Sequence, residues 1–322
     1  MTPRQGRSRK TCVFSIAMIT IICPSLDDKR LYRIDTLRAG DVHRAVEVLT
    51  QASGKGANAA RALACFGVRS ALVAPAGDAL RRHLLEELAP LRVQLDLVRT
   101  VAPTRSCITV LEADGRATEL VQEALPLEFE EAQTLLRRAL VALDHATALL
   151  LTGSLPSGCT GELYSLCAAR ASERHLPTVV DAQGEAALYA LRGMPTVFKV
   201  TREELLATVR AIAPDRADPQ ADVSALCATL REHGARHVVI TDGARPVTVV
   251  SEEGASWEIP VPPIELRNSI GSGDAMSAGI LLGLSTGESL DDAVARGVRF
   301  GCANARTVHP GELDMDWLRG EG

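Results

Sequence analysis

The second half of the chain alternates short apolar runs with longer amphipathic stretches, and this rhythm limits the folds open to it more than any other feature. The apolar runs are rich in Val, Ile and Leu and fall at 146–153, 177–182, 196–201 and 237–241. The spacing of apolar residues predicts helices around them at 127–143, 161–174, 202–209 and 223–234. Strands that alternate with helices of about 10–15 residues predict an α/β fold, a doubly wound, mainly parallel sheet flanked by helices.

Two hairpin patterns interrupt this rhythm in the first half of the chain. Apolar and polar residues alternate on both sides of the turn sequences "RAGD" and "ADGR", which is typical of paired strands with one open face. We expect these strands, at roughly 29–52 and 104–123, to form a small sheet outside the main body that acts as a lid.

The N-terminal region combines basic residues with an apolar run at 13–23. This run is too short to span a bilayer, and no A-x-A cleavage pattern follows it. Its Val, Ile and Thr content instead predicts a buried first strand. We expect a disordered leader at 1–11 and a single α/β domain at 12–322.

Composition and charge restrict the class of partner. The chain has 322 residues with a formal net charge of −5, which does not indicate a polyanion such as nucleic acid as the partner. Its eight cysteines include no C-x-x-C pair, so they predict reduced thiols rather than a zinc site or a disulfide framework. We therefore expect a cytoplasmic protein that binds neither nucleic acid nor membrane.

A glycine-rich turn near the C-terminus carries a carboxylate where a helix begins. The stretch "NSIGSGDAMSAGILLGL" at 268–284 places Gly271, Ser272, Gly273 and Asp274 at this junction. Small residues let several backbone N–H groups point at one spot, and the helix dipole favours an anion there. Asp274 is then either a base beside a bound phosphate or an N-cap of the helix. Met276 rules out G-x-G-x-x-G, and no P-loop motif occurs.

A second glycine-rich turn enters a helix near the N-terminus, in "SGKGANAARALACFG" at 53–67. Lys55 and Asn58 supply donors beside this turn. By itself the stretch is equally compatible with an ordinary connection between a strand and a helix.

Together the two turns resemble the paired signatures of the ribokinase-like (PfkB-type) carbohydrate kinases, and the resemblance extends in order over most of the chain. Asn268, "GSLPSG" and "PSLD" are similar to the hexose-phosphate branch, which includes 1-phosphofructokinase and tagatose-6-phosphate kinase. The further matching segments are "CPSLD" (23–27), "PTRSCITV" (103–110), "TGSLPSG" (152–158), "VDAQGEAAL" (180–188), "FKVTREEL" (198–205) and "ITDGA" (240–244).

The resemblance implies a role for each matching residue. Asp274 would accept the proton of a sugar hydroxyl, and the amides of Gly271, Ser272 and Gly273 would hold the phosphoryl group in transfer. A sugar that already carries a phosphate needs a second anion site, which Arg105 and Lys55 would supply. The residues expected to bind the substrate are Asp27, Gly54, Lys55, Asn58, Arg105 and Ser154.

The cofactors implied by the resemblance are ATP and Mg²⁺. Lys199, Thr241 and Gly243 would line the ATP site, and Asn304 would border the adenine. Glu204 would organise water around the Mg²⁺ that neutralises the ATP phosphates.

The reaction implied is the ATP-dependent phosphorylation of fructose 1-phosphate to fructose 1,6-bisphosphate. Tagatose 6-phosphate and fructose 6-phosphate are alternative substrates, followed by an unphosphorylated sugar or a nucleoside. A degenerate protein that only binds a sugar phosphate is the remaining alternative. Relatives often pair through exposed lid sheets, so a homodimer through the lid is expected.

Three positions depart from the family pattern. Thr201 stands where Asn is usual, Ser53 where Gly is usual, and Cys23 where Asn or Ala is common. These departures bear on substrate identity and turnover more than on the type of reaction.

Overall fold

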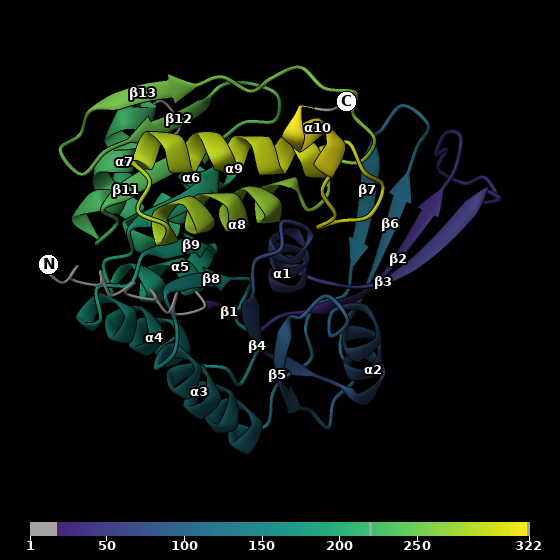
Figure 1. Ribbon diagram of the computed structural model, residues 1–322, viewed down its shortest axis with the longest axis horizontal. Coiled ribbons are helices and arrows are strands. Elements are labelled where there is room, and N and C mark those ends of the chain that lie inside the picture. Colours follow the sequence, from purple (N-terminus) through teal and green to yellow (C-terminus); the bar gives the residue numbers. More distant parts are fainter. Residues whose placement is uncertain (1–17, 219–220, 321–322) are drawn as a thin grey trace, which may run out of the picture.

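The computed structural model describes residues 18–218 and 221–320. Within these residues a large sheet with helices on both faces forms the body, and a smaller sheet stands to one side of it (Figure 1). The predicted leader at 1–11 and the first part of the predicted first strand lie outside the described residues. No helix in the described part of the chain combines the length and apolar character needed to cross a membrane.

The body sheet confirms the predicted, mainly parallel architecture. Its order is β13-β12-β11-β10-β9-β8-β1-β4-β5 in the described residues. The strands β11, β10, β9, β8, β1, β4 and β5, which follow one another in this order, run parallel. Only β12 and β13 are added antiparallel at one edge. The sequence patterns did not predict β5, β12 or β13. The bounds are β1 Ile19–Ile22, β4 Ser70–Ala76, β5 Gln94–Arg99, β8 Ala148–Thr152, β9 Thr178–Asp181, β10 Val197–Thr201, β11 His237–Thr241, β12 Val247–Val250 and β13 Ser256–Ile259.

The helices cover the body sheet in two layers, each with its own apolar core. Successive side chains of a strand point to opposite faces, so Ile21 joins one core and Ile22 the other. The first layer holds α1 (Lys55–Cys65), α2 (Asp78–Glu87), α8 (Ser272–Ser285) and α9 (Leu290–Ala305). The second holds α3 (Phe129–Leu143), α4 (Glu162–Glu173), α5 (Gly184–Leu191), α6 (Arg202–Ile212) and α7 (Val223–Glu232), and α10 (Met315–Arg319) ends the described chain.

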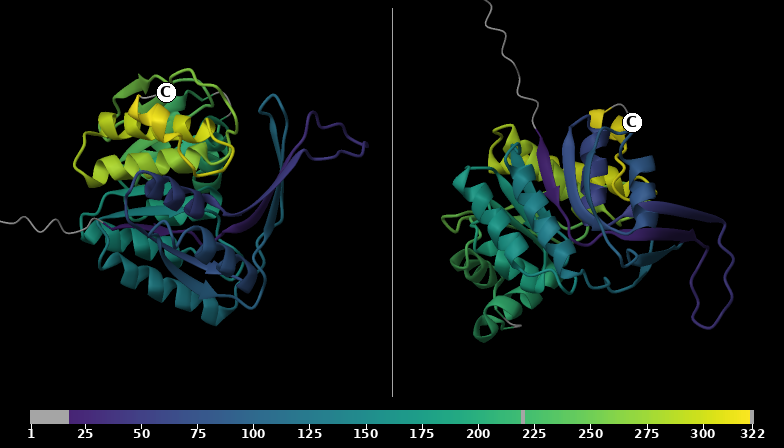
Figure 2. Two further views of the ribbon diagram at one scale, coloured as in Figure 1. Left: turned by 45° about the vertical axis from the view of Figure 1, so that its right-hand side comes forward. Right: turned by 90° about the horizontal axis from the view of Figure 1, so that it is seen from below.

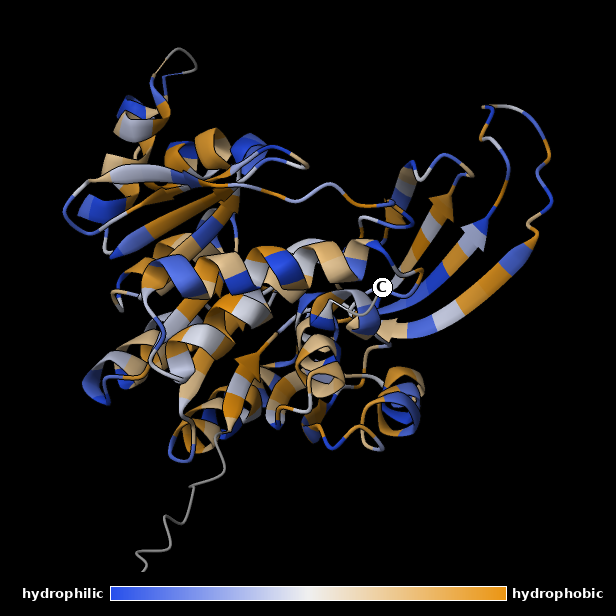
Figure 3. Ribbon diagram, turned by 45° about the horizontal axis from the view of Figure 1, so that its top comes forward, coloured by the Kyte–Doolittle hydropathy of each residue, from blue (hydrophilic) through white to orange (hydrophobic). Residues whose placement is uncertain are grey.

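The lid sheet is built from the two predicted hairpins and projects from the body (Figure 2). Its order is β3-β2-β6-β7, with β2 parallel to β6 at the centre and an antiparallel partner on each side. A loop at 34–46, longer than the tight turn expected at "RAGD", joins the first pair. Hydrophobic and hydrophilic residues alternate along the lid strands (Figure 3). Their bounds are β2 Asp27–Arg33, β3 Glu47–Ser53, β6 Ser106–Leu111 and β7 Ala117–Val121.

A buried arginine fastens the root of the lid to the body. The guanidinium of Arg61 on α1 donates to the carbonyl of Ala52 at 2.9 Å and to Glu87 Oε2 at 2.8 Å. It also donates to the Pro310 carbonyl at 3.1 Å. The loop that contains Pro310 packs against Gly271, so the lid root and the C-terminal glycine turn share one support.

Candidate active site

A cleft of about 570 Å³ lies between the lid and the carboxyl ends of the central strands. Both glycine turns open into it, as expected for a parallel α/β sheet, in which ligands bind at the carboxyl ends of the strands. The predicted site residues that line it are Asp27, Gly54, Lys55, Asn58, Arg105, Ser154, Glu204, Gly271 and Asp274.

Asp274 faces this cleft from the first turn of α8. Gly271, not Asp274, is the N-cap of the helix, so the alternative that Asp274 serves as its cap is wrong. Gly271 has a φ of +84°, and a Cβ there would lie 3.0 Å from the backbone nitrogen of Gly311. The carboxylate of Asp274 accepts a hydrogen bond from Asn58 Nδ2 at 2.8 Å. Burial raises the pKa of Asp274 to about 6, against the opposing charge of Lys55.

The backbone N–H groups that precede Asp274 differ in their hydrogen bonding. The N–H of Ser272 donates to the carbonyl of Ser269 at 3.2 Å. By contrast, the N–H groups of Gly271 and Gly273 make no hydrogen bond within the described parts of the chain. Free amides at the positive end of a helix dipole form a site for an anion.

The first glycine turn orients the partner of Asp274. Gly54 has a φ of +102°, and a Cβ there would lie 2.8 Å from the Cα of Leu26, so only glycine fits. Ser53 Oγ donates to Asn58 Oδ1 at 3.1 Å, which leaves the amide nitrogen of Asn58 directed at Asp274. The serine that departs from the family pattern therefore takes part in the site.

Asp181, at the end of β9, was missed by the sequence analysis. Its two carboxylate oxygens accept from Lys55 Nζ at 2.8 Å and from Lys199 Nζ at 2.9 Å. Ser277 Oγ adds a third donor at 2.9 Å. Burial by itself would raise the pKa of Asp181, but the two ammonium groups outweigh it and hold that pKa well below its ordinary value. A carboxylate directly after a buried strand, in "VVDA", was the signal that could have identified it.

The lid wall of the cleft contains charged side chains from β2, from β7 and from Arg105, which directly precedes β6. Arg105 Nη2 lies 3.9 Å from Asp27 Oδ2, and Lys29 Nζ lies 2.7 Å from Glu119 Oε1. Among the described residues, three buried atoms here have no hydrogen-bond partner: Ser25 Oγ, Asp27 Oδ1 and Arg105 Nε. Buried polar atoms without partners are costly and rare in folded proteins, so their clustering indicates a place for polar groups of a ligand. Lys29 and Glu119 were also missed by the sequence analysis.

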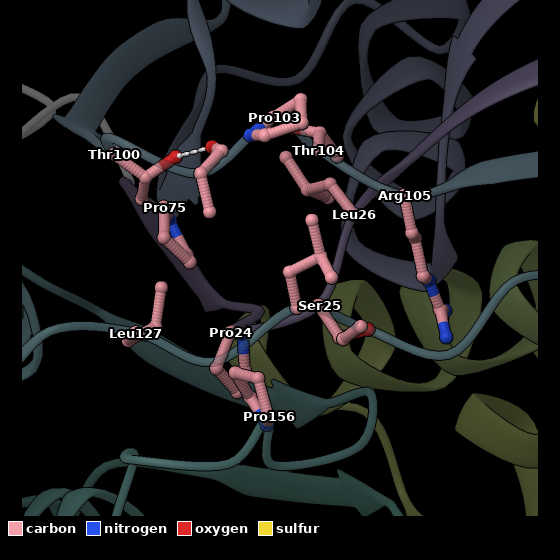
Figure 4. Close-up of a pocket in the computed structure, with 13 residues that line it drawn as sticks. Pro24, Ser25, Leu26, Pro75, Thr100, Pro103, Thr104, Arg105, Leu127 and Pro156 are labelled. Atoms are coloured by element: carbon pink, nitrogen blue, oxygen red, sulfur yellow. Dashed lines mark hydrogen bonds between the residues drawn. The ribbon is translucent and has the colours of Figure 1, made fainter.

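Figure 4 shows the recess beside Arg105 and Ser25, whose walls include four prolines. Its volume is only about 30 Å³, which suits about one water molecule. The segment that leads into β6 is held there, since Gly77 donates its N–H to Thr104 Oγ1 at 2.9 Å. The side chain of Arg105 extends away from the recess, so this rigid segment presents Arg105 to the cleft. The prolines are Pro24, Pro75, Pro103 and Pro156.

Glu204 and Thr201 form a capping box at the start of α6. Thr201 Oγ1 accepts from the N–H of Glu204 at 3.2 Å, and Glu204 Oε2 accepts from the N–H of Thr201 at 3.0 Å. Gln183 Nε2 donates to the other carboxylate oxygen of Glu204. The threonine at this position therefore fixes the glutamate that faces the cleft.

The remaining predicted residues lie outside the lining of the cleft. The Nζ of Lys199 lies beneath the start of α8, where a Cβ on Gly273 would be 3.5 Å from it. Thr241 ends β11 beside Thr201, and Gly243 follows it in the next turn. Asn304 on α9 is buried, and its amide donates to the carbonyls of residues 309 and 312, in the loop that packs on Gly271. Their roles around ATP stay predictions.

The fold and the cleft define a ribokinase-like protein, with a mainly parallel α/β body, a separate small sheet and a glycine turn at the start of α8. Residues 8–316 match the pfkB family of carbohydrate kinases, and the chain belongs to that family. The resemblance inferred from the two glycine turns is thus confirmed.

Individual relatives support the hexose-phosphate branch. A tagatose-6-phosphate kinase from Staphylococcus epidermidis is 25% identical over 302 residues, which cover 91% of this chain and 93% of that protein. The tetrameric inhibited form of phosphofructokinase-2 from Escherichia coli superposes with a TM-score of 0.78 at 25% identity, covering 90% and 94% of the two chains. A Thermotoga maritima protein described as a possible 1-phosphofructokinase shares the fold, with a TM-score of 0.81, 20% identity and coverage of 94% and 97%.

Proposed function

We propose that this carbohydrate kinase uses ATP to phosphorylate a ketohexose that already carries one phosphate, converting fructose 1-phosphate to fructose 1,6-bisphosphate. The observation that carries the proposal is one cleft lined by Asp274, by Gly271 with its free backbone N–H, and by Arg105. Tagatose 6-phosphate is the second candidate, because a relative over nearly the whole chain is a tagatose-6-phosphate kinase.

In this proposal Asp274 is the general base. A carboxylate with a pKa of about 6 is ionised at neutral pH and still basic enough to accept a proton in the transition state. It takes the proton of the sugar hydroxyl, whose oxygen then forms a bond to the γ-phosphorus of ATP in line with the bond to ADP that breaks. The amides of Gly271 and Gly273 donate to the oxygens of the group in transfer, where negative charge must be balanced.

Glu204 is the residue proposed to serve Mg²⁺. The described residues contain no group of three His, Cys, Asp or Glu side chains able to hold a metal ion. Mg²⁺ commonly keeps several waters and uses one or two carboxylates together with substrate phosphates, so a single carboxylate such as that of Glu204 fits it. When bound, the ion neutralises charge on the ATP phosphates. Lys199, Thr241, Gly243 and Asn304 are proposed to surround the rest of ATP.

Glu204→Gln is expected to raise the Mg²⁺ concentration for half-maximal rate by about tenfold. Glutamine also completes a capping box, so α6 keeps its N-terminal hydrogen bonds while the charge is removed. Glu203→Gln, on the exposed side of the same turn, is the matched control. Rates titrated with Mg²⁺ at saturating ATP make the comparison, and an equal Mg²⁺ requirement in both variants would contradict the role of Glu204.

The proposed reaction is tested by ADP release from the purified protein with Mg-ATP. The phosphoryl acceptors compared are fructose 1-phosphate, tagatose 6-phosphate, fructose 6-phosphate, ribose and adenosine. A strong response to a phosphorylated ketohexose supports the proposal and identifies the substrate. Activity confined to ribose or adenosine contradicts it, and ATP binding without ADP release from any of them would indicate a degenerate binding protein.

A homodimer through the lid is proposed as the assembly. Several apolar side chains of the lid are at least half exposed, and an open sheet edge favours association. Sedimentation velocity is expected to give twice the mass of one chain, and a monomer at micromolar concentration would contradict it. The apolar side chains are those of Val42, Val46, Val48, Leu120 and Val121.

A further inference from the structure

An ion pair in the lid joins a buried ammonium to a more exposed carboxylate. Lys29 on β2 and Glu119 on β7 face the cleft from opposite sides of β6, with Nζ and Oε1 2.7 Å apart. The side chain of Lys29 is only 6% exposed, whereas that of Glu119 is 37% exposed. The carboxylate can therefore turn toward solvent, while the ammonium cannot leave the cleft wall.

Arg105 completes a group of two cations on this wall. Lys29 and Asp27 lie two positions apart on β2, so their side chains point to the same face of the strand. Arg105 Nη2 lies 3.9 Å from Asp27 Oδ2. Arg105 Nε is buried without a hydrogen-bond partner in the described residues. On the lid wall Lys29 forms an ion pair with Glu119, whereas the Nε–H of Arg105 donates no hydrogen bond to the described residues.

We propose that Lys29 is a specificity-determining residue, which together with Arg105 binds the phosphate already present on the sugar. In the absence of that phosphate, Glu119 forms the ion pair with Lys29. This inference rests on the proposed function and assigns a residue of its substrate site. The incoming phosphate takes over the hydrogen bond from Lys29 Nζ, and the carboxylate of Glu119 moves toward solvent.

The exchange follows from the cost of leaving a buried ammonium unpaired. If Glu119 moved away and nothing replaced it, Lys29 would lose its hydrogen-bonded anion and keep only the more distant charge of Asp27 in a poorly solvated place, which is unfavourable. A phosphate dianion restores the pairing with more charge and more acceptor oxygens than a carboxylate. An unphosphorylated sugar offers no such replacement, so Lys29 stays paired with Glu119 and gives that sugar no binding energy.

Glu119 is also held in place, which makes it a defined competitor. Its Oε1 accepts from Thr109 Oγ1 at 3.1 Å, and the thiol of Cys107 lies 3.5 Å away. Loss of the carboxylate charge should therefore strengthen phosphate binding, while loss of the Lys29 charge should weaken it. Opposite effects from the two halves of one ion pair distinguish this role from a purely structural salt bridge.

The test compares Lys29→Met, Glu119→Gln and Arg30→Met, the last being a control at the exposed neighbour of Lys29 on the same strand. Steady-state kinetics give KM for fructose 1-phosphate and for ATP, and calorimetry gives the binding of fructose 1-phosphate without turnover. Lys29→Met is expected to raise the sugar-phosphate KM by about ten- to a hundredfold with little change in KM for ATP. Glu119→Gln is expected to lower the KM for the sugar phosphate by about two- to tenfold. In free energy this is about half, or less, of the contribution of a hydrogen bond to a charged group.

The outcomes separate this inference from the proposed function. An active wild type whose Lys29→Met variant binds fructose 1-phosphate as well as Arg30→Met does would overturn the inference alone. Equal weakening by Lys29→Met and Glu119→Gln would also overturn it, since the pair would then act as one structural unit. A wild type inactive on every phosphorylated ketohexose contradicts the proposed function itself. Should Lys29→Met not fold, the double variant with Glu119→Gln leaves no unpaired charge and carries the same expected rise in KM.

Discussion

Asp274→Asn is expected to lower kcat by about a hundredfold to ten-thousandfold, the range for loss of a general base. Asparagine keeps the size of the side chain and an oxygen that can accept from Asn58 Nδ2, so the cleft retains its shape. The amide cannot take a proton from the sugar hydroxyl. The measurement is single-turnover ADP formation at saturating sugar phosphate and Mg-ATP. A variant with the wild-type rate would show that Asp274 is not the base.

The same substitution is expected to stabilise the fold at neutral pH. Burial lifts the pKa of Asp274 from 3.8 to about 6, so the folded protein holds the ionised carboxylate less well than the unfolded chain does. This difference corresponds to at most about 3 kcal/mol, fully present above pH 6 and absent below about pH 4. Urea unfolding at pH 5 and pH 7.5 should therefore show a larger advantage for Asp274→Asn at pH 7.5. A variant less stable than the wild type at pH 7.5 would contradict the burial argument.

The pH dependence of the wild-type rate follows from the same group. The ionised form of Asp274 is the active one, so kcat/KM should rise with pH and level off above about pH 6. A value of kcat/KM that stays constant from pH 5 to pH 7.5 would mean that proton transfer to Asp274 is not part of the reaction.

Asp181→Asn is expected to lower the free energy of unfolding by about 3–5 kcal/mol, because it leaves the buried ammonium of Lys199 and the partly exposed one of Lys55 without their carboxylate. Lys199 is almost fully buried and has no way to reach solvent. Lys55, released from Asp181, also loses its fixed position beside Asp274, so kcat should fall together with stability. Asp144→Asn is the matched control, since Asp144 pairs with Arg170 at the surface, where an ion pair contributes little to stability.

Urea unfolding at neutral pH measures this difference, and acid should reduce it. The pKa of Asp181 is depressed in the folded protein, so its contribution is present above the ordinary aspartate pKa of about 4 and is lost as the pH falls through the folded value. If Asp181→Asn and Asp144→Asn unfold at the same urea concentration at pH 7, the buried Lys199 does not depend on Asp181.

Much of the fold and part of the site could be predicted from local patterns. Runs of Val, Ile and Leu indicate the buried strands, and each glycine turn consists of residues that are consecutive in the sequence. Gly54 and Gly271 have positive φ angles and no room for a Cβ, so a turn of this kind leaves a signature that can be read along the chain. Strands β12 and β13 were not predicted, because they are added antiparallel and lack the alternation with helices that marks the parallel strands.

The contacts that complete the site join residues far apart in the chain. The hydrogen bond from Asn58 to Asp274 spans 216 positions, the pair between Lys55 and Asp181 spans 126, and that between Lys29 and Glu119 spans 90. No local pattern records such a distance. For this reason Arg105 and Asp274 could be predicted from their motifs, whereas Glu119 could not.

The carboxylates of Asp181 and Asp274 illustrate what the sequence leaves open. By itself it determined that a mainly parallel α/β sheet would form, that two glycine turns would each lead into a helix, and that Asp274 would follow one of them. Only the tertiary structure decided how the carboxylates differ. Asp181 contacts two ammonium groups, which stabilise its charge and depress its pKa. Asp274 is equally buried but is held by one neutral amide, so desolvation prevails, its pKa rises, and it is left able to accept a proton.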